Sequence, residues 1–446
     1  MLERIREFFR NDTESFHDHR KVLLPTTREE VLITGAQGPY IDVVKDGNQL
    51  NDVIDATSQV GTNPLGHRYE PLLEKVRELF SQDSNFPLMT SGQSFYNVYQ
   101  RTLAETFTDI YPGNLSNGDL KTYYCNSGSE AVERGCLKAA ALARGGNSYI
   151  GFENAFHGRT SLALSHTNSK GEQTEGFNFL ARVLTVPYAT HSGGQFHNDP
   201  EENAKKALDV LQHRINHEGP DNINSIMIEP LQGEGGYNVP HKMFIQGINE
   251  IASEHSIPLI ADEIQSSLRT GEWFAIQHFD VQPDMISVAK AFSGGIAPFG
   301  ASLIKDEYAT DQTGKHSGTF GGNAKECFIA QQTIEIIQEH GFLDNAREQG
   351  EYLKQQLKEL EDYEIVHEVR GKGLFLGIEF RKNGKPAPEL RRKILDHLLK
   401  EEGILTEGCG NRNDNTAIRF LLPVNIDRGV IDDIVSGVER TVEHFS

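Results

Sequence analysis

The central part of this chain alternates short apolar runs with helical patterns, and this alternation constrains the fold more than any other feature. It extends from about Asp119 to Lys305, and each run has the length of a β-strand. Strands that are separated by helices pair in parallel through right-handed crossovers, so we predict an α/β domain with a mostly parallel central sheet. The predicted strands are Thr122–Cys125, Ser148–Phe152, Ile223–Ile228, Ile257–Ala261, Met285–Ala289 and Ala301–Ile304.

The residues on either side of this region follow other patterns. Two short strands are expected before it, at Val31–Thr34 and Tyr40–Val44, and they are separated at Gly35 and Gly38. After it, strands and helices follow one another closely, which indicates a smaller α+β domain. The elements expected there are the helix Ala324–Glu339, the strands Glu364–Val369 and Leu374–Phe380, the helix Pro388–Glu402, the strand Ala417–Leu422 and the helix Asp427–Phe445. The predicted division is an N-terminal arm with part of the small domain at 1–60, a large domain at 61–325 and a C-terminal small domain at 326–446.

The charge balance excludes some classes of partner. The 446 residues include 43 Lys and Arg against 64 Asp and Glu, which gives a formal net charge of −21. Such a surface repels phosphate backbones and anionic membranes, so we expect neither nucleic acid nor a membrane as a partner. The four cysteines form no C-x-x-C pair, and no apolar stretch reaches the ~18 residues of a membrane span. We therefore predict a cytoplasmic protein. His17, Asp18 and His19 are interpreted as part of a solvated arm, and no metal is expected.

The segment that follows the first predicted strand of the sheet has the pattern of a helix start. Ser127 and Glu130 have the spacing of a capping box, and the predicted helix runs to Arg144 before Gly145. Free N–H groups at a helix start, with Gly128 allowing close approach, form a cradle for a phosphate. An ordinary capped helix is the alternative interpretation. The apolar stripe expected on this helix is Ala131, Val132, Cys136, Ala139, Ala140 and Ala143.

Two charged residues follow buried strands of the predicted sheet. Asp262 ends the run Pro258–Ala261, and Lys290 ends the run Met285–Ala289. Burying an ammonium is costly unless it is paired or loses its proton, so Lys290 is a candidate nucleophile for a carbonyl, with a surface lysine as the alternative. A phosphate cradle, a carboxylate and a lysine on successive strands are together what pyridoxal 5′-phosphate requires.

Several segments together resemble the class III, fold-type I pyridoxal-phosphate aminotransferases, a group that includes the acetylornithine, ornithine and 4-aminobutyrate aminotransferases. The resemblance extends from about Val31 to the C-terminus. It implies a large cofactor-binding domain with a mostly parallel sheet and a smaller α+β domain. The segments that carry it are Asn126–Ala131, Phe156–Thr160, Glu229–Gly236, Asp262–Gln265, Lys290 and Thr319–Asn323.

The resemblance also implies the residues that hold the cofactor. Lys290 would form the Schiff base and shuttle a proton, while Asp262 would pair with the ring nitrogen. Thr319 would reach the phosphate from the neighbouring subunit, which implies a homodimer with shared active sites, and dimers could pair into tetramers. The other cofactor contacts implied are Ser127, Gly128 and Ser129 near the phosphate, Phe156 and His157 near the ring, and Gln265 near the phenolic oxygen.

The same resemblance implies a substrate class. Arg159 would bind one substrate carboxylate and Arg370 another, and Glu234 would mask this second arginine when an ω-amine enters. These residues suit transfer between a basic, ω-amino or N-acylated amino acid and a 2-oxo acid such as 2-oxoglutarate. The loop Ser266–Gly271 is one residue shorter than the family pattern, which affects the substrate mouth. A racemase or 2-epimerase of the same fold and a non-catalytic cofactor-binding scaffold remain alternatives.

Overall fold

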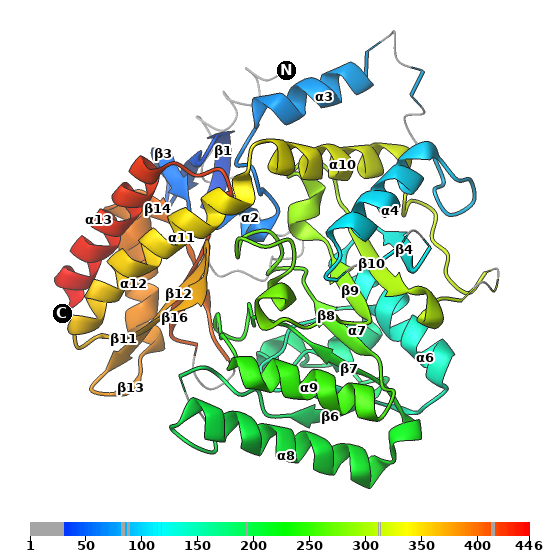
Figure 1. Ribbon diagram of the computed structural model, residues 1–446. Helices are drawn as coiled ribbons and strands as arrows, with labels where there is room; N and C mark the ends of the chain where they lie inside the picture. Colours follow the sequence, from blue (N-terminus) through cyan, green and yellow to red (C-terminus); the bar gives the residue numbers. More distant parts are fainter. Residues whose placement is uncertain are drawn as a thin grey trace.

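The computed structural model describes residues 31–81, 85–86, 90–113, 115–116, 118–192, 195–310, 312, 314–411 and 415–446, which form three β-sheets with covering helices (Figure 1). The segment with His17, Asp18 and His19 lies outside the described residues. No helix in the described part of the chain combines the length and the apolar character needed to cross a bilayer.

The largest sheet has seven strands, and most of them are parallel, as predicted. One expectation was wrong: β10 is antiparallel to both of its neighbours. Only a short 3₁₀ turn and a loop connect it to β9, and a parallel pairing needs a longer crossover. The edge strand β6 was not predicted, because its run begins with Arg182 and is only partly buried. In spatial order, the strands are β4 (Leu120–Cys125), β10 (Gly300–Lys305), β9 (Met285–Val288), β8 (Leu259–Asp262), β7 (Ile223–Ile228), β5 (Ser148–Phe152) and β6 (Arg182–Val186).

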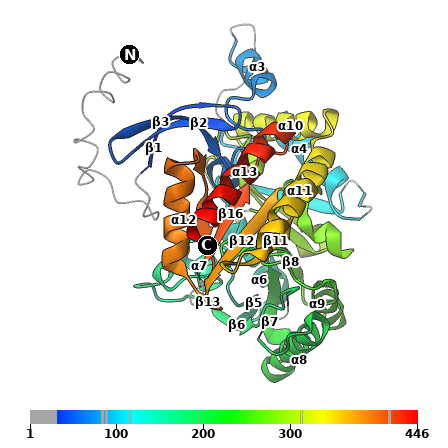
Figure 2. The ribbon, with the colours of Figure 1, turned by 90° about the vertical axis from the view of Figure 1, so that its left-hand side faces the viewer.

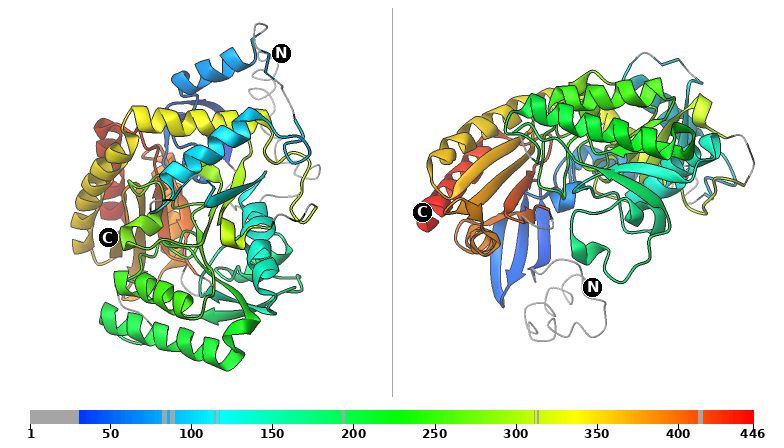
Figure 3. Two further views of the ribbon diagram at one scale, coloured as in Figure 1. Left: turned by 45° about the vertical axis from the view of Figure 1, so that its right-hand side comes forward. Right: turned by 90° about the horizontal axis from the view of Figure 1, so that it is seen from below.

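Helices cover both faces of this sheet, because successive residues of each strand point to opposite faces and pack into two different apolar cores. Ile260 packs with residues of the α6 side, whereas its neighbours Leu259 and Ala261 belong to the core that includes Leu211 of α8 and Phe244 of α9. Figure 3 shows α8 and α9 side by side on their face of the sheet. The helices of this part are α3 (Glu70–Leu79), α4 (Val98–Ile110), α5 (Gly128–Glu130), α6 (Lys138–Arg144), α7 (Ser161–Ser165), α8 (Pro200–Glu218), α9 (Lys242–Glu254) and α10 (Ala324–Glu339).

The two smaller sheets lie together on one side of the large sheet (Figures 2 and 3). The N-terminal and C-terminal parts of the chain meet here, because β14 from the C-terminal part pairs in parallel with β3. The first sheet contains β1 (Val31–Gln37), β2 (Tyr40–Lys45), β3 (Asn48–Asp55) and β14 (Ile404–Leu405). The second contains β11 (Val366–Lys372), β12 (Phe375–Lys382), β13 (Lys385–Pro386), β15 (Glu407–Cys409) and β16 (Ala417–Leu421). The helices α11 (Phe342–Lys358), α12 (Pro388–Lys400) and α13 (Arg428–Phe445) cover them.

Most of the elements expected outside the central region are present, with small shifts of their ends. Gly35 was expected to separate two strands, but it lies inside β1. The register between β1 and β2 is irregular there, and the Asp42 side chain packs against Gly35. The chain turns at Gly38 instead, where φ is 57°. The short helix α2 (Ser58–Gly61) follows β3, and 3₁₀ turns complete the fold at Gly171–Gln173, Pro220–Asn222, Ala275–Phe279, Lys290–Ser293, Asp306–Tyr308 and Glu359–Asp362.

The helix predicted from Gly128 to Arg144 is continuous but contains a π-helical segment at Ala131–Leu137. The Ser302 hydroxyl of β10 donates a 2.7 Å hydrogen bond to the Ala131 carbonyl and occupies the space beside Gly135. A partner that enters the hydrogen-bond ladder widens a helix locally. Ala143, in the last turn of α6, is exposed, contrary to the prediction, whereas the five other residues of the predicted stripe are buried.

Gly135→Ala is therefore expected to destabilise the protein by about 1–3 kcal/mol, because the added methyl group overlaps the Ser302 side chain. Thermal or denaturant unfolding measures this change. Gly429→Ala is the matched control, since position 429 faces open space, and there we expect no loss of stability. Equal unfolding midpoints for Gly135→Ala and wild type would contradict this packing.

Candidate functional site

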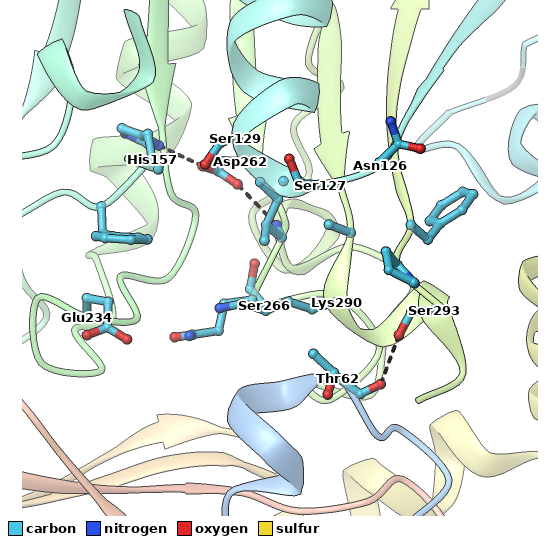
Figure 4. A pocket seen from close by; sticks show the side chains of 18 of the residues that line it. Thr62, Asn126, Ser127, Ser129, His157, Glu234, Asp262, Ser266, Lys290 and Ser293 are labelled. Atoms are coloured by element: carbon cyan, nitrogen blue, oxygen red, sulfur yellow. Dashed lines mark hydrogen bonds and ion pairs between the residues drawn. The ribbon is translucent and has the colours of Figure 1, made fainter. Parts of the chain in front are cut away.

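A cavity of about 500 Å³ opens where β8 and β9 end and the helix after β4 begins. In Figure 4, Ser127, Ser129 and Asp262 lie on one side of it and Thr62 on the other. Open α/β sheets bind ligands at the carboxyl ends of their strands, which is where this cavity lies. Nine of the predicted site residues line it: Ser127, Gly128, Ser129, Phe156, His157, Glu234, Asp262, Gln265 and Lys290.

Lys290 follows β9 and presents its amine to this cavity. Burial lowers the pKa of Lys290 to about 8, although the Glu234 carboxylate opposes the shift. Its backbone has a φ of 35°, a strained conformation for a residue with a side chain, and such strain concentrates at functional sites. Lys290 thus combines a constrained position with an amine that loses its proton more readily than a surface lysine.

The lowered pKa makes the reactivity of Lys290 toward an aldehyde depend on pH near neutrality. The neutral amine is the nucleophile, so reactivity rises as the pH rises through the pKa of about 8 and is then constant. We expect the rate at which the cofactor-free protein takes up pyridoxal 5′-phosphate, measured by rapid-mixing absorbance, to follow this curve. A midpoint near the ordinary lysine value of about 10.4 would contradict the burial of the amine.

Asp262 is the last residue of β8, and three donors hold its carboxylate. Ser287 Oγ and the Ile264 N–H donate to Oδ1 at 3.2 and 3.1 Å, and His157 Nδ1 lies 2.7 Å from Oδ2. His157 is itself buried, which lowers its pKa, but the hydrogen bond and charge of Asp262 outweigh burial and raise the pKa overall. The Asp262 carboxylate therefore favours the protonated form of His157.

The helix start beside Asp262 leaves room for an anion. The Ser127 hydroxyl accepts a bond from the Glu130 N–H at 3.3 Å, as a capping residue does. The expected reciprocal bond differs by one position, because the Glu130 carboxylate accepts from the Asn126 N–H at 2.8 Å. Gly128 packs against Ile264 so closely that an added side-chain carbon would lie 2.8 Å from it. A side chain at position 128 would therefore displace Ile264, which also lines the cavity, so glycine keeps the helix start in place beside it.

The residues around the cavity fit pyridoxal 5′-phosphate. A fixed carboxylate, an amine of lowered pKa and a helix start match the ring nitrogen, the aldehyde and the phosphate. Gln265 Oε1 is buried and has no hydrogen-bond partner among the described residues, so it is available to a polar group of the cofactor. Among those residues no cluster suits a metal ion.

Glu229, which the sequence analysis did not single out as a site residue, fixes two parts of the cavity wall. Its carboxylate accepts 2.9 Å bonds from the Phe156 N–H and from the Gly233 N–H. Burial raises the pKa of Glu229 to about 7. The position of Phe156, the residue expected to stack on the cofactor, thus depends on a buried carboxylate. The signal for it was the isolated acidic residue at the end of an apolar strand.

The expected pairing of Glu234 with Arg370 is wrong. Glu234 forms ion pairs with Arg419 of β16 and with Lys170. Arg370 pairs instead with Glu368 and Glu379. Arg370 is already fixed, since its Nε also donates a 2.8 Å bond to the Gly236 carbonyl, and it does not line the cavity. Two carboxylates thus already neutralise this guanidinium, and it does not face the cavity where a substrate carboxylate would bind. Arg419 was missed, although an arginine in the middle of an apolar strand signals a buried ion pair.

Two other predicted residues lie outside the cavity wall of this chain. Arg159 is exposed, and its guanidinium lies 5.6 Å from the centre of the Phe156 ring. Thr319 is also exposed, and neither residue is among those that line the cavity. Arg159 is nevertheless tied to the helix start, because its N–H donates to Ser129 Oγ at 3.3 Å.

Comparisons with known proteins agree with this geometry. Residues 25–442 match the family model described as aminotransferase class-III. The chain is 32% identical over 420 residues to the acetylornithine aminotransferase of Methanocaldococcus jannaschii, and the matched region covers 92% of each chain. It is 30% identical over 421 residues to the ornithine aminotransferase of Staphylococcus carnosus, covering 92% of this chain and 93% of the relative. The omega transaminase of Pseudomonas jessenii in complex with PMP superposes with a TM-score of 0.85 at 24% identity, covering 96% and 97% of the two chains. These matches confirm the predicted fold and family.

Proposed function

This chain belongs to the class-III aminotransferases, a family that depends on pyridoxal 5′-phosphate, and from this premise we propose that it moves an amino group between an acetylornithine- or ornithine-like amino acid and a 2-oxo acid such as 2-oxoglutarate. The observation that carries the proposal is the convergence of Lys290, Asp262 and the Ser127 helix start on one cavity. In a ping-pong cycle, the amino donor leaves as an oxo acid before the acceptor enters the same site.

Each of these residues has a defined task in this cycle. Lys290 would hold the cofactor aldehyde until the substrate amine replaces it. Its freed Nζ would then take the proton from the substrate carbon that bears the amino group and deliver it to the cofactor carbon that carried the aldehyde. Asp262, fixed by Ser287 and His157, would hold the proton on the ring nitrogen. The bound cofactor supplies an electron-withdrawing ring that stabilises negative charge on the substrate carbon. Phe156 would cover one ring face.

The pair formed by Glu234 and Arg419 supports a substrate with two different ends. Glu234 lines the cavity and covers Arg419, so that an ω-amine or N-acyl group meets a neutral ion pair. If Glu234 moves away, Arg419 can bind the distal carboxylate of an acceptor such as 2-oxoglutarate bidentately. In the proposed function Arg419 therefore takes the role that the sequence analysis gave to Arg370, and Arg159 keeps the other carboxylate.

We also propose that two copies of the chain share their active sites. Thr319 is exposed and lies away from its own cavity, as expected of a residue that acts in the partner. It is followed by the exposed Phe320, and the neighbouring segment carries the exposed Phe95 and Tyr96. The two segments are adjacent, since the Asn97 side chain donates a 3.0 Å bond to the Gly322 carbonyl. Such an apolar patch is typical of an interface between subunits, and light scattering will measure the subunit number.

The substrate proposal is tested with a panel of amino donors assayed for glutamate formation from 2-oxoglutarate. We expect transfer from acetylornithine, ornithine or another ω-amino acid, with a matching oxo product. A reaction in deuterated water could instead place deuterium on a substrate carbon whose configuration is inverted, without any oxo acid. That result would indicate a racemase or epimerase. A purified protein that binds no pyridoxal 5′-phosphate would contradict the proposal altogether.

A further inference from the structure

We propose that Lys170 and Glu407 determine how well the enzyme accepts a dicarboxylic 2-oxo acid, by holding the two ends of the ion pair between Glu234 and Arg419. This inference rests on the proposed function and deepens it, since it names two residues that set the choice between dicarboxylic and monocarboxylic acceptors. Neither residue lines the cavity, so both act through the pair.

The four side chains form a row of alternating charges. Arg419 donates from Nη1 to Glu234 and from Nη2 to Glu407, so its two ends have different carboxylate partners. Glu234 also has two partners, because Lys170 Nζ donates to its second oxygen at 3.3 Å. The row therefore runs from Glu407 through Arg419 and Glu234 to Lys170, and its formal charges cancel.

Burial makes this arrangement energetically important. The Arg419 side chain is only 5% exposed, and those of Glu234 and Lys170 are 16% and 21% exposed. A buried charge that loses its only partner is strongly destabilised. If the contact between Glu234 and Arg419 breaks, neither residue is left without an ionic partner. Glu234 remains paired with Lys170, and Arg419 remains paired with Glu407. The row thus permits the pair to open.

The two outer residues have opposite effects on a dicarboxylic acceptor. Its distal carboxylate can reach Arg419 only after Glu234, which lies in the cavity wall, has moved aside. Lys170 favours that movement, because it attracts Glu234 away from Arg419. Glu407 opposes binding, because it already neutralises part of the positive charge that Arg419 offers. A monocarboxylic acceptor has no distal carboxylate, leaves the row closed and is insensitive to both residues.

The experiment compares 2-oxoglutarate and pyruvate as acceptors for the cofactor-loaded enzyme, with one amino donor throughout. Lys170→Met is expected to raise the KM for 2-oxoglutarate about five- to tenfold, and Glu407→Gln is expected to lower it several-fold. The KM for pyruvate and the kcat for both acceptors should not change. A general structural defect would not move one KM in opposite directions in the two variants.

Matched controls and a binding measurement separate this inference from the proposed function. Glu368→Gln removes a carboxylate from Arg370 in the same sheet, and Lys205→Met removes an exposed paired lysine, so neither should alter the preference. Calorimetry with glutarate and butyrate, which lack the reacting carbonyl, should show the same opposite shifts in glutarate affinity alone. Unchanged ratios, or equal shifts for both acceptors, would overturn the inference. An enzyme that transfers no amino group but shows these shifts would refute only the proposed function.

Discussion

Replacing Lys290 by alanine is expected to reduce amino transfer at least about 10³-fold, because in the proposed function Lys290 is both the nucleophile for the cofactor aldehyde and the base that moves the substrate proton. The fold should persist, since the side chain makes no ion pair or hydrogen bond within the described residues and lies at the cavity wall. Steady-state kinetics measure the loss. Reduction with borohydride followed by mass spectrometry should attach the cofactor to wild type and not to the variant.

Two further variants separate the chemical role of Lys290 from its charge. Lys290→Arg keeps a positive charge in the cavity but provides no amine that can react, so we expect it to be as inactive as Lys290→Ala. Lys325→Ala removes a lysine of α10 that does not line the cavity and should leave the activity unchanged. If Lys290→Ala retains turnover and the covalent link, the assignment of Lys290 is wrong.

Asp262→Asn is expected to reduce kcat about 10²- to 10³-fold. The amide keeps the shape of the carboxylate but loses the negative charge that, in the proposed function, holds a proton on the ring nitrogen. The amide can still accept hydrogen bonds from Ser287 Oγ and the Ile264 N–H, so the strand end should keep its structure. Asp284→Asn is the matched control. Its carboxylate accepts from the Leu259 N–H at the opposite end of β8, where loss of charge should affect stability and not kcat.

The same variant should change the titration of His157. In wild type, Asp262 outweighs burial and raises the pKa of His157. The neighbouring His166 has no carboxylate partner among the described residues, and burial together with the charge of His157 lowers its pKa to about 3. In Asp262→Asn we therefore expect the pKa of His157 to fall below its ordinary value, which nuclear magnetic resonance titration measures. A histidine whose pKa is raised by folding stabilises the protein below its unfolded pKa and loses this effect as the pH rises through the folded pKa. The stability lost in Asp262→Asn should thus be larger at about pH 5–6 than at pH 8. An unchanged His157 titration would contradict the coupling.

The sequence was sufficient to predict the parts of the site that depend on local structure. Asp262 and Lys290 each follow a short apolar run, and parallel strands bring their carboxyl ends to one edge of a sheet. Ser127 precedes a helix whose first turn it caps, so its hydroxyl and the adjacent backbone had to lie at that same edge. Asp262, Lys290, Ser127 and Gly128 line one cavity for these reasons, whereas the family resemblance implied the other five predicted residues that line it.

Local patterns could not predict which charged groups pair across the chain. Glu234 was predicted to pair with Arg370, but it contacts Arg419, which is 185 positions away in the sequence. The fold brings β16, which carries Arg419, next to Glu234 in the cavity wall. Arg370, in β11, instead meets Glu379 of the adjacent β12, with which it forms a local pair. Sequence spacing does not report the distance between strands of different sheets.

The chain by itself determined an α/β fold, the order of its strands along the sequence and the chemistry available at two strand ends, because apolar period and residue type act over a few positions. Contacts between elements far apart in sequence, by contrast, placed Ser302 against the helix at Ala131 and Arg419 beside Glu234. The same is true of the pairing of β10 with β4, whereas its antiparallel direction relative to β9 follows from the short connection between them. A buried charge or hydroxyl takes the partner that the assembled core brings within reach.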